Sequence, residues 1–402
     1  MKKSTKIIIH VGIIVFALLF LSVGNQIASK GTVYNFYTHQ RFPMAEAKVI
    51  RVLEVTQSDA QGWEQTVTTF EARILTGEHK GTTTIAVHAQ RSPFQGIVDK
   101  AVESGDKIIM TLVDELWYYS SYVHTDKIIA LALLFAILLL VFGKIKGLNS
   151  ILALGFTAGA IFAIFIPAIL SGKNIYAAAI IVCVFSTITT LFIVYGVTRQ
   201  SIASAIGCFG GVIASGLLAL FMNNALRITG VLDTETQSLL FFPTEIPIDL
   251  KAVVFAGIII GALGAIMDVS VSIASSLAEI KQKAPDLNGA GLFKSGMNIG
   301  RDIMGSMTNT LVLAYVGSSI MVILLLLVNS SSMLHLLNRE IVLVEFLQTL
   351  IGSLGLLLTI PLTALVCAVL YSGGKGLGND SSNHNHSFNS DFNKDEWIDM
   401  NS

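Results

Sequence analysis

A strip of small, hydroxyl and acidic side chains runs along an otherwise apolar segment between residues 250 and 280. At about 100° per residue, an α-helix places all of these positions on one narrow face. A carboxylate at membrane depth is energetically costly, so it usually faces a partner or a hydrated cavity. We therefore expect Asp268 to exchange a proton or to bind a cation. This acidic strip consists of Gly257, Gly261, Gly264, Asp268, Ser272, Ser275 and Glu279.

A second polar strip follows at the start of the next apolar segment. Its residues share one helical face by the same arithmetic, so we expect the two strips to converge in a hydrated groove at the inner membrane surface. Arg301 is adjacent and could neutralise either Asp268 or Asp302. A static, hydrogen-bonded knot of these three charged residues, which fixes the helix register, is the alternative to an ion-coupling site. The second polar strip consists of Asn298, Asp302, Ser306 and Asn309.

A basic segment separates the two strips. Lys281, Lys283 and Lys294 surround Pro285 and the stretch Gly289–Gly291, and proline and glycine commonly interrupt helices. We expect a basic cytoplasmic loop here. A re-entrant or surface-lying element that touches anionic lipid is the alternative.

The composition is that of a membrane protein, with 53% hydrophobic and only 13% charged residues. A net charge of −1 gives no reason to expect a nucleic-acid partner. Cys183, Cys208 and Cys367 lie in apolar runs, which is typical of small buried hydrophobic residues. We find no paired nucleophile and base, zinc motif or phosphate-binding glycine loop, so we expect neither an enzyme nor a bound cofactor or metal.

Eight segments approach the roughly 20 apolar residues that a bilayer-spanning helix needs. They predict a membrane α-helical bundle, with an N-terminal anchor in residues 1–24 and seven further helices in residues 127–372. Prolines in two of the segments are tolerable in a bilayer when neighbouring groups satisfy the freed backbone. The segments are Ile7 to Val23, Lys127 to Phe142, Ile151 to Leu170, Ile175 to Val197, Ile202 to Met222, Lys251 to Ser272, Asn309 to Val328, and Ile341 to Tyr371.

Basic residues are unevenly distributed between the two sides of these segments. Cytoplasmic loops of membrane proteins carry an excess of lysine and arginine. This rule predicts a plasma-membrane protein with both termini in the cytoplasm. The cytoplasmic side would hold Lys2, Lys3, Lys6, Lys144, Lys146, Arg199, Lys281, Lys283, Lys294, Arg301 and Lys375, against Lys173, Arg227, Lys251 and Arg339 on the other side.

The segment between the first two helices, residues 25–126, has the pattern of a small extracytoplasmic all-β domain. Phe70 and Ile74 share one face of an alternating run, and Ile85 and Val87 repeat the alternation. Four or five strands in about 100 residues favour a barrel of the OB type, and a sandwich is the alternative.

Glycines recur at four-residue spacing in three of the predicted helices. The pairs are Gly155 with Gly159, Gly207 with Gly211, and Gly257 with Gly261, and Gly264 lies on the same face as the last pair. Two helix backbones can approach closely where side chains are small, so these residues are expected to pack helices together.

The composition changes after Tyr371 to glycine, serine, asparagine and aspartate. Such a sequence buries too little apolar surface to order itself. We expect residues 373–402 to form a disordered cytoplasmic tail, in which His384 and His386 are too few to hold a metal tightly.

Two stretches of the chain resemble the YibE/F family of bacterial multi-pass membrane proteins. They are GALGAIMDVSVSIASSLAEI (Gly261 to Ile280) and GRDIMGSMTNTLVLAYVGSSI (Gly300 to Ile320), and the resemblance extends over most of the chain. It implies a plasma-membrane protein and brings no activity, substrate or catalytic residue with it.

A weaker likeness concerns the order of the elements. The order of elements in this chain is similar to that in the second half of the SecD/SecF and RND transporter membrane domain. The elements are an anchor, an external domain, a helix with Asp268, Ile273 and Glu279, a basic loop and another helix with a polar start. The present chain departs from it in its larger number of helices and smaller external domain. Shared architecture does not fix function, so this likeness favours transport only as an analogy.

Two functions follow from these patterns. The acidic strip favours a transporter or a proton- or cation-coupled conduit for an unknown small solute or ion. The separate β domain favours a non-transporting scaffold that binds a partner outside the membrane. The expected partners are the lipid bilayer and a second membrane subunit or further copies of the chain.

Overall fold

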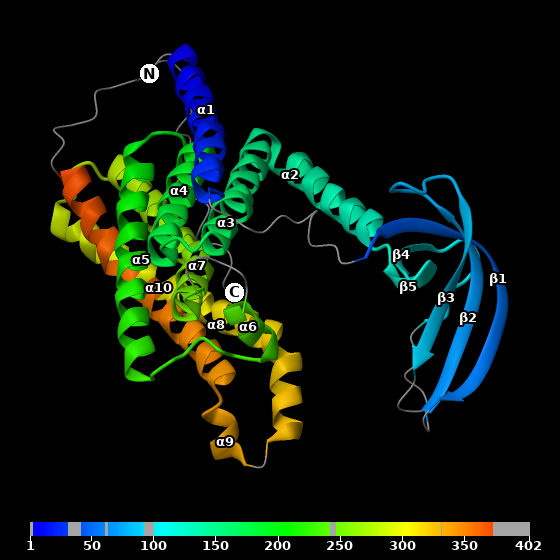
Figure 1. The fold of residues 1–402 in the computed structure, drawn as a ribbon. Helices are drawn as coiled ribbons and strands as arrows, with labels where there is room; N and C mark the ends of the chain where they lie inside the picture. Colours follow the sequence, from blue (N-terminus) through cyan, green and yellow to red (C-terminus); the bar gives the residue numbers. More distant parts are fainter. Residues whose placement is uncertain are drawn as a thin grey trace, which may run out of the picture.

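The molecule consists of a helical bundle and a small β-barrel (Figure 1). The barrel lies in sequence between the helices α1 (Lys3–Ala28) and α2 (Thr125–Ala160). The predicted tail, residues 373–402, falls outside the part of the chain that the structure describes. The computed structural model describes residues 3–30, 42–60, 63–91, 100–241, 247–330 and 332–372.

Five strands close the barrel in the order β1-β2-β3-β5-β4. Neighbouring strands are antiparallel except β3 and β5, which are parallel. This confirms the small barrel that the sequence predicts near the N-terminus. The strands are β1 (Met44–Ala60), β2 (Trp63–Ile74), β3 (Thr83–Arg91), β4 (Lys107–Val113) and β5 (Leu116–Tyr122).

The buried face of β3 is the opposite of the one expected from its apolar residues. Ile85 is 54% exposed, whereas Ala86 and His88 are buried. The strand register explains this, because Ala86 pairs with Phe70 and His88 with Thr68, and directly paired residues lie on the same face of a sheet. The inner face of β3 is therefore small and polar, and the ring of His88 lies against that of Tyr119 with 3.9 Å between centroids.

The core of the barrel depends on Phe70, whose side chain is 0% exposed. Phe70→Ala should destabilise the barrel by about 3–5 kcal/mol, because it leaves a large cavity. The measurement is the resistance of the barrel to proteolysis in the full chain. Ile85→Ala is the control and should change stability by less than about 0.5 kcal/mol, since Ile85 is exposed. Equal resistance of the two variants would contradict this assignment of the core.

An exposed ion pair joins the barrel to the following helix. Lys107 Nζ donates to Asp126 Oδ2 at 2.5 Å, and this hydrogen bond together with the charge of the carboxylate raises the pKa of Lys107. Both side chains are well exposed, so solvent screening leaves the pair little influence on stability. Only Val123 and His124 separate β5 from α2.

Seven helices in the described part of the chain are long and apolar enough to cross a membrane. Three of them, α5, α7 and α10, pack against one another at the centre of the bundle, and α8 lies against α10. The remaining elements after α2 are the π-helix η1 (Ile161–Phe165), α3 (Ile166–Leu170), α4 (Ile175–Tyr195), α5 (Arg199–Ala225), α6 (Thr234–Ser238), the short η2 (Leu239–Phe241), α7 (Leu250–Lys283), α8 (Gly289–Asn329), α9 (Met333–Leu337) and α10 (Glu340–Ser372).

Helix α2 is broken at Lys144, where the backbone adopts φ 48° and ψ −125°. A side chain at Gly147 would overlap the carbonyl group of Leu139, so the chain can turn back only because residue 147 is glycine. Figure 1 shows the two pieces of α2 at an angle to each other. The break lies between two of the predicted segments, Lys127 to Phe142 and Ile151 to Leu170.

Small residues form the contact between α5 and its neighbours. Ser270 Oγ of α7 donates to the carbonyl oxygen of Ser204 at 2.6 Å and lies 3.2 Å from Thr363 Oγ1 of α10. A Cβ atom at Gly207 would overlap the hydroxyl group of Thr363. At Gly211 it would overlap that of Thr359 and also meet Gly355. We call Gly207 and Gly211 the glycine seam.

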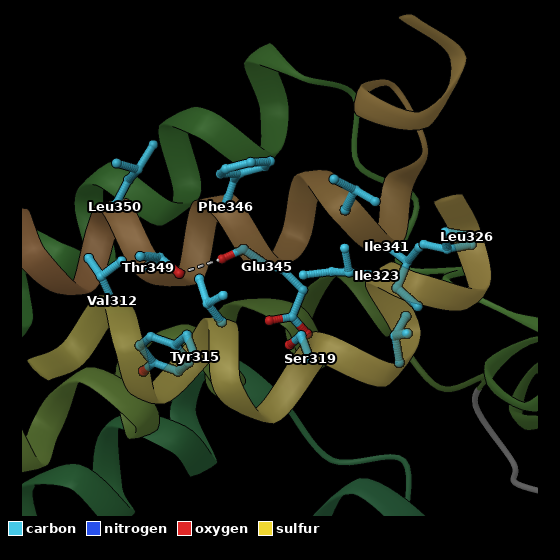
Figure 2. A pocket seen from close by; sticks show the side chains of 13 residues that line it. Val312, Tyr315, Ser319, Ile323, Leu326, Ile341, Glu345, Phe346, Thr349 and Leu350 are labelled. Carbon is cyan, nitrogen blue, oxygen red and sulfur yellow. Dashed lines mark hydrogen bonds between the residues drawn. The ribbon is translucent and has the colours of Figure 1, made fainter. Parts of the chain in front are cut away.

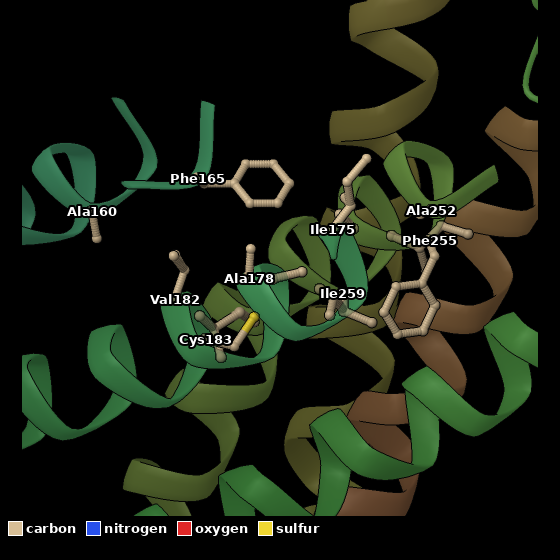
Figure 3. Packing of buried hydrophobic residues seen from close by; sticks show 14 of the residues in the cluster. Ala160, Phe165, Ile175, Ala178, Val182, Cys183, Ala252, Phe255 and Ile259 are labelled. Carbon is tan, nitrogen blue, oxygen red and sulfur yellow. The ribbon is translucent and has the colours of Figure 1, made fainter. Parts of the chain in front are cut away.

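Apolar side chains hold α4 and α1 against this centre. Figure 3 shows Phe255 and Ile259 of α7 within the same buried cluster as Val182 and Cys183 of α4. Helix α1 joins through Phe20, whose ring stacks on that of Phe185 with 4.3 Å between centroids. The outer helices are therefore attached by ordinary hydrophobic burial.

Helix α8 begins earlier than the sequence pattern suggests. Asn288 caps it by accepting a hydrogen bond from the backbone N–H of Gly291 at 2.8 Å. The predicted basic loop is therefore limited to residues 284–288, and the stretch Gly289–Gly291 forms the first turn of the helix. A capping asparagine compensates for the low helix propensity of these glycines.

Helices α7 and α10 begin at the same end of the bundle. The carboxylate of Glu340 accepts hydrogen bonds from the backbone N–H groups of Thr229 at 2.6 Å and Gly230 at 2.5 Å. Gly230, at φ 84°, also lies directly against Leu250, the first residue of α7. Residue numbers along the two helices can therefore be compared as depths from this shared end.

Candidate functional site

An open cavity of about 490 Å³ lies between the second half of α2, α4 and α7. Asp268 of α7 lies on its wall, and the side chain of this residue is exposed. We call it the Asp268 cavity. Its polar wall residues besides Asp268 are Ser150 and Thr157 of α2 and Ser186, Thr190 and Tyr195 of α4.

The carboxylate of Asp268 has no cationic partner in the described part of the chain. The ion pairs found there involve other residues, and the wall of the cavity includes no lysine, arginine or histidine. Asp268 lies 18 residues beyond Leu250, or about 27 Å along the helix at 1.5 Å per residue. The acid is thus held far from the start of α7 without a neutralising group.

Ser186 supplies a second unsatisfied group on the same wall. The residue is 1% exposed, and its hydroxyl has no hydrogen-bond partner among the described residues. The adjacent Thr187 differs, because its hydroxyl donates to the carbonyl oxygen of Cys183 at 2.8 Å. A buried hydroxyl left unpaired costs about 1–3 kcal/mol, so the wall beside the cavity carries an uncompensated polar group.

Helical spacing explains why these side chains meet. Ser186 and Thr190 are four residues apart, and Ser150 and Thr157 are seven apart, so each pair lies on one face of its helix. The N-terminus of α4 is fixed by Asn174, whose side chain accepts from the backbone N–H of Ala177 at 3.0 Å. The three helices therefore present hydroxyl groups and one carboxylate to a common space.

The predicted acidic strip is divided by the cavity. Gly261 and Gly264 line it together with Asp268. Ser272 and Ser275 lie beyond it, as does Glu279, whose carboxylate accepts from Lys283 Nζ at 2.7 Å. Only the middle of the strip therefore belongs to the site.

The second polar strip does not line the Asp268 cavity, and no ion pair joins Arg301 or Asp302 to Asp268 in the described part of the chain. Helix α8 packs through Gly296 against Leu277 and Ala364, and through Gly300 against Ile360. This packing turns the strip outward because its residues lie on other faces of α8. The exposed residues are Asn298, Arg301, Asp302, Ser306 and Asn309.

The predicted packing role fits some glycines and not others. Gly207 and Gly211 form tight contacts between helices, and Gly261 lies close to side chains of α8 and α10. No atom would lie within 4 Å of a Cβ atom at Gly257 or Gly264. A side chain at either position would therefore meet no neighbouring helix, although the carbonyl oxygen of Gly257 accepts a hydrogen bond from Gln348 Nε2 of α10 at 3.5 Å. Gly264 leaves room in the Asp268 cavity.

Sequence reasoning missed the hydroxyl groups of α2 and α4. The signal was the spacing of Ser186 and Thr190, but Thr187 and Thr189 on other faces of the same helix obscured it. A carboxylate with several hydroxyls offers hard oxygen ligands, which suit a proton, water or a hard cation. No group of three histidine, cysteine, aspartate or glutamate residues that could hold a metal occurs among the described residues.

Long apolar helices around a cavity that contains one carboxylate and several hydroxyl groups are features typical of multi-pass membrane proteins. Comparison with protein families identifies the group more closely. The model of the family described as YibE/F-like protein matches residues 131–373, which is more than half of the chain. The chain therefore belongs to the YibE/F-like family, as its sequence suggests. No curated protein and no solved structure matches it.

Proposed function

We propose that this protein is a plasma-membrane transporter, or ion-coupled conduit, that binds a proton or a cation at Asp268. The observation that carries the proposal is the position of this carboxylate on the wall of an open cavity that also holds several hydroxyl groups, with no ion pair to Asp268 in the described part of the chain. A charge at membrane depth without a partner is rarely kept for packing alone.

The energetics of the site favour an ionic occupant. Asp268 has no cationic neighbour among the described residues, so a bound proton or cation would compensate the charge of its carboxylate. A static structural role would instead require a neighbouring group of the protein to compensate that charge.

Reconstitution in liposomes tests this function. Vesicles that contain the full chain should dissipate an imposed proton or sodium gradient faster than protein-free vesicles. A rate equal to that of empty vesicles for both ions would refute the proposal.

The proposed topology has eight membrane crossings. The apolar stretch Thr125–Leu170 contains 46 residues, which as one straight helix would be about 69 Å long, more than twice the hydrocarbon thickness of a bilayer. The break at Lys144 supports two crossings in place of one. With the uneven distribution of lysine and arginine, eight crossings leave both termini in the cytoplasm and the barrel outside.

Cysteine labelling checks this topology. A cysteine in place of Glu78, in the exposed loop between β2 and β3, should react with a membrane-impermeant maleimide on intact cells. A cysteine in place of Lys146, near the α2 break, should react only after the cells are permeabilised. The native cysteines are buried and should contribute little background. The reverse labelling pattern would overturn the orientation.

A scaffold role is the second candidate. It is favoured by apolar side chains on the outside of the barrel, such as Val55 and Ile85, at 59% and 54% exposure, which could contact a partner. A protein that acts only as a scaffold would keep its function when Asp268 is replaced by asparagine.

A further inference from the structure

The Asp268 cavity has the size and the wall of a small-molecule site. Its volume of about 490 Å³ lies within the range of about 300–1,000 Å³ that is usual for such sites, which are lined mainly by apolar side chains with a few polar groups. About half of the wall residues are aliphatic or methionine, among them Leu154 of α2, Val194 of α4 and Met267 of α7. An inorganic ion would leave this apolar surface without a partner.

The charge of the wall favours a ligand with a single positive charge. Asp268 is the only charged side chain among the described residues that form the wall. A metal ion such as Mg²⁺ or Ca²⁺ needs several oxygen ligands at once, and no group of three histidine, cysteine, aspartate or glutamate residues that could hold one occurs in the described part of the chain. An ammonium group, in contrast, needs only one carboxylate to compensate its charge.

Tyr195 adds an aromatic ring beside the acid. The residue is 45% exposed and lines the same cavity, and it lies close enough to Asp268 for the two groups to interact electrostatically. Ammonium groups are attracted to aromatic rings, most clearly where water is excluded. The cavity therefore combines a carboxylate, an aromatic residue and apolar surface.

A second cavity, between α8 and α10, provides a comparison (Figure 2). It also contains one carboxylate, that of Glu345, which points toward Ser319 in Figure 2, and the rest of its wall is largely aliphatic. Its volume of about 220 Å³ is below the usual range of small-molecule sites. A lipophilic cation attracted to any acid in an apolar space would respond to both carboxylates, whereas a ligand of the Asp268 cavity would respond to Asp268 alone.

We propose that the Asp268 cavity binds an organic monocation, with one ammonium group on a compact apolar body, in exchange for a proton. This inference rests on the proposed function and names its substrate class. The ammonium group pairs with the carboxylate, and the body covers the apolar part of the wall. Since the described wall offers one carboxylate, the organic cation and the proton exclude each other there. Tyr195 is the other titratable side chain on that wall.

Equilibrium binding of radiolabelled benzyltrimethylammonium to the full chain in detergent tests the site. Asp268→Asn should weaken binding at least about tenfold, because the ammonium group loses its counter-charge in a partly desolvated space. Glu345→Gln is the matched control and should bind the probe like the unmodified protein. An excess of neopentylbenzene, in which carbon replaces the charged nitrogen, should displace little of the probe.

Gly264→Leu tests the location of the ligand by filling the cavity. Gly264 lines the cavity and has no atom within 4 Å of its Cβ position, so an isobutyl group there can enter the space without displacing a helix. It should weaken binding of the probe at least about tenfold, because the apolar body loses its contacts with the wall. Gly257→Leu has the same open Cβ position outside the cavity and should bind normally.

The outcomes separate this inference from the proposed function. Unchanged binding by Asp268→Asn or by Gly264→Leu overturns the inference, as does a loss of binding confined to Glu345→Gln. Full displacement by neopentylbenzene overturns it as well and marks the cavity as an apolar groove for lipid. If such a result accompanies a proton flux that Asp268→Asn stops, the coupling site stands and the substrate class is wrong.

If the unmodified protein neither binds the probe nor moves protons or sodium, both proposals fail. Unchanged gel-filtration profiles of the variants show that a loss of binding does not reflect unfolding.

Discussion

Asp268→Asn is expected to reduce ion flux at least about a hundredfold, within the range contributed by positioned proton-transfer groups. The amide has nearly the shape of the carboxylate but neither its charge nor its proton exchange. The folded state should be affected little, by less than about 0.5 kcal/mol, because the side chain faces an open cavity and forms no ion pair in the described part of the chain. Flux in proteoliposomes and thermal stability in detergent measure the two effects.

Glu279→Gln is the matched control for this substitution. Glu279 lies on the same helix but outside the Asp268 cavity, exposed and paired with Lys283. Its substitution should leave the flux unchanged, since an exposed pair within one helix contributes only a few tenths of a kcal/mol. Normal flux through the Asp268→Asn variant would show that the carboxylate is not the coupling group.

Gly211→Val is expected to cause a large loss of stability in the bundle. Its Cβ atom would overlap the hydroxyl of Thr359 and lie 2.9 Å from Ile266 and 3.2 Å from the carbonyl oxygen of Gly355. Overpacking of this kind typically costs about 1–3 kcal/mol. The cost should reach the upper part of that range, because one of the obstructing atoms belongs to a helix backbone and cannot move alone.

Gly257→Val separates this packing effect from the general effect of valine in a helix. Gly257 has no atom within 4 Å of its Cβ position, so only the small difference in helix propensity remains. Thermal unfolding, monitored by gel filtration after heating, should show a clearly lower melting temperature for Gly211→Val than for Gly257→Val. Equal melting temperatures would mean that the glycine seam is not tightly packed.

Helical periodicity predicts which residues share a face, and it did so for the centre of the acidic strip. Gly261, Gly264 and Asp268 lie together on one cavity wall. Periodicity cannot predict which helix covers that face, because it describes one helix at a time. It therefore points to the next helix along the chain as the partner, whereas the residues that share a cavity with the acid come from α2 and α4, which are distant in sequence.

Two further differences between the predicted and the observed structure have local physical causes. Alternation located β3, but cross-strand register decides which of its faces is buried, and Ala86 with His88 occupies the inside. The start of α8 was missed because the glycines after Asn288 suggest a break, while the capping side chain stabilises a helix there. Elements defined by many apolar residues were thus easier to predict than faces or ends that depend on a few contacts.

The glycine seam has a consequence for how the Asp268 cavity can change shape. Helix α7 is locked to α5 and α10 by interlocking backbones and hydroxyls, whereas α2 reaches the cavity after a sharp turn at Lys144. Helix α4 is also held to α7 by the buried hydrophobic cluster. We therefore expect a change in the shape of the cavity to come mainly from α2, which would carry Ser150 and Thr157 toward an aspartate that stays in place.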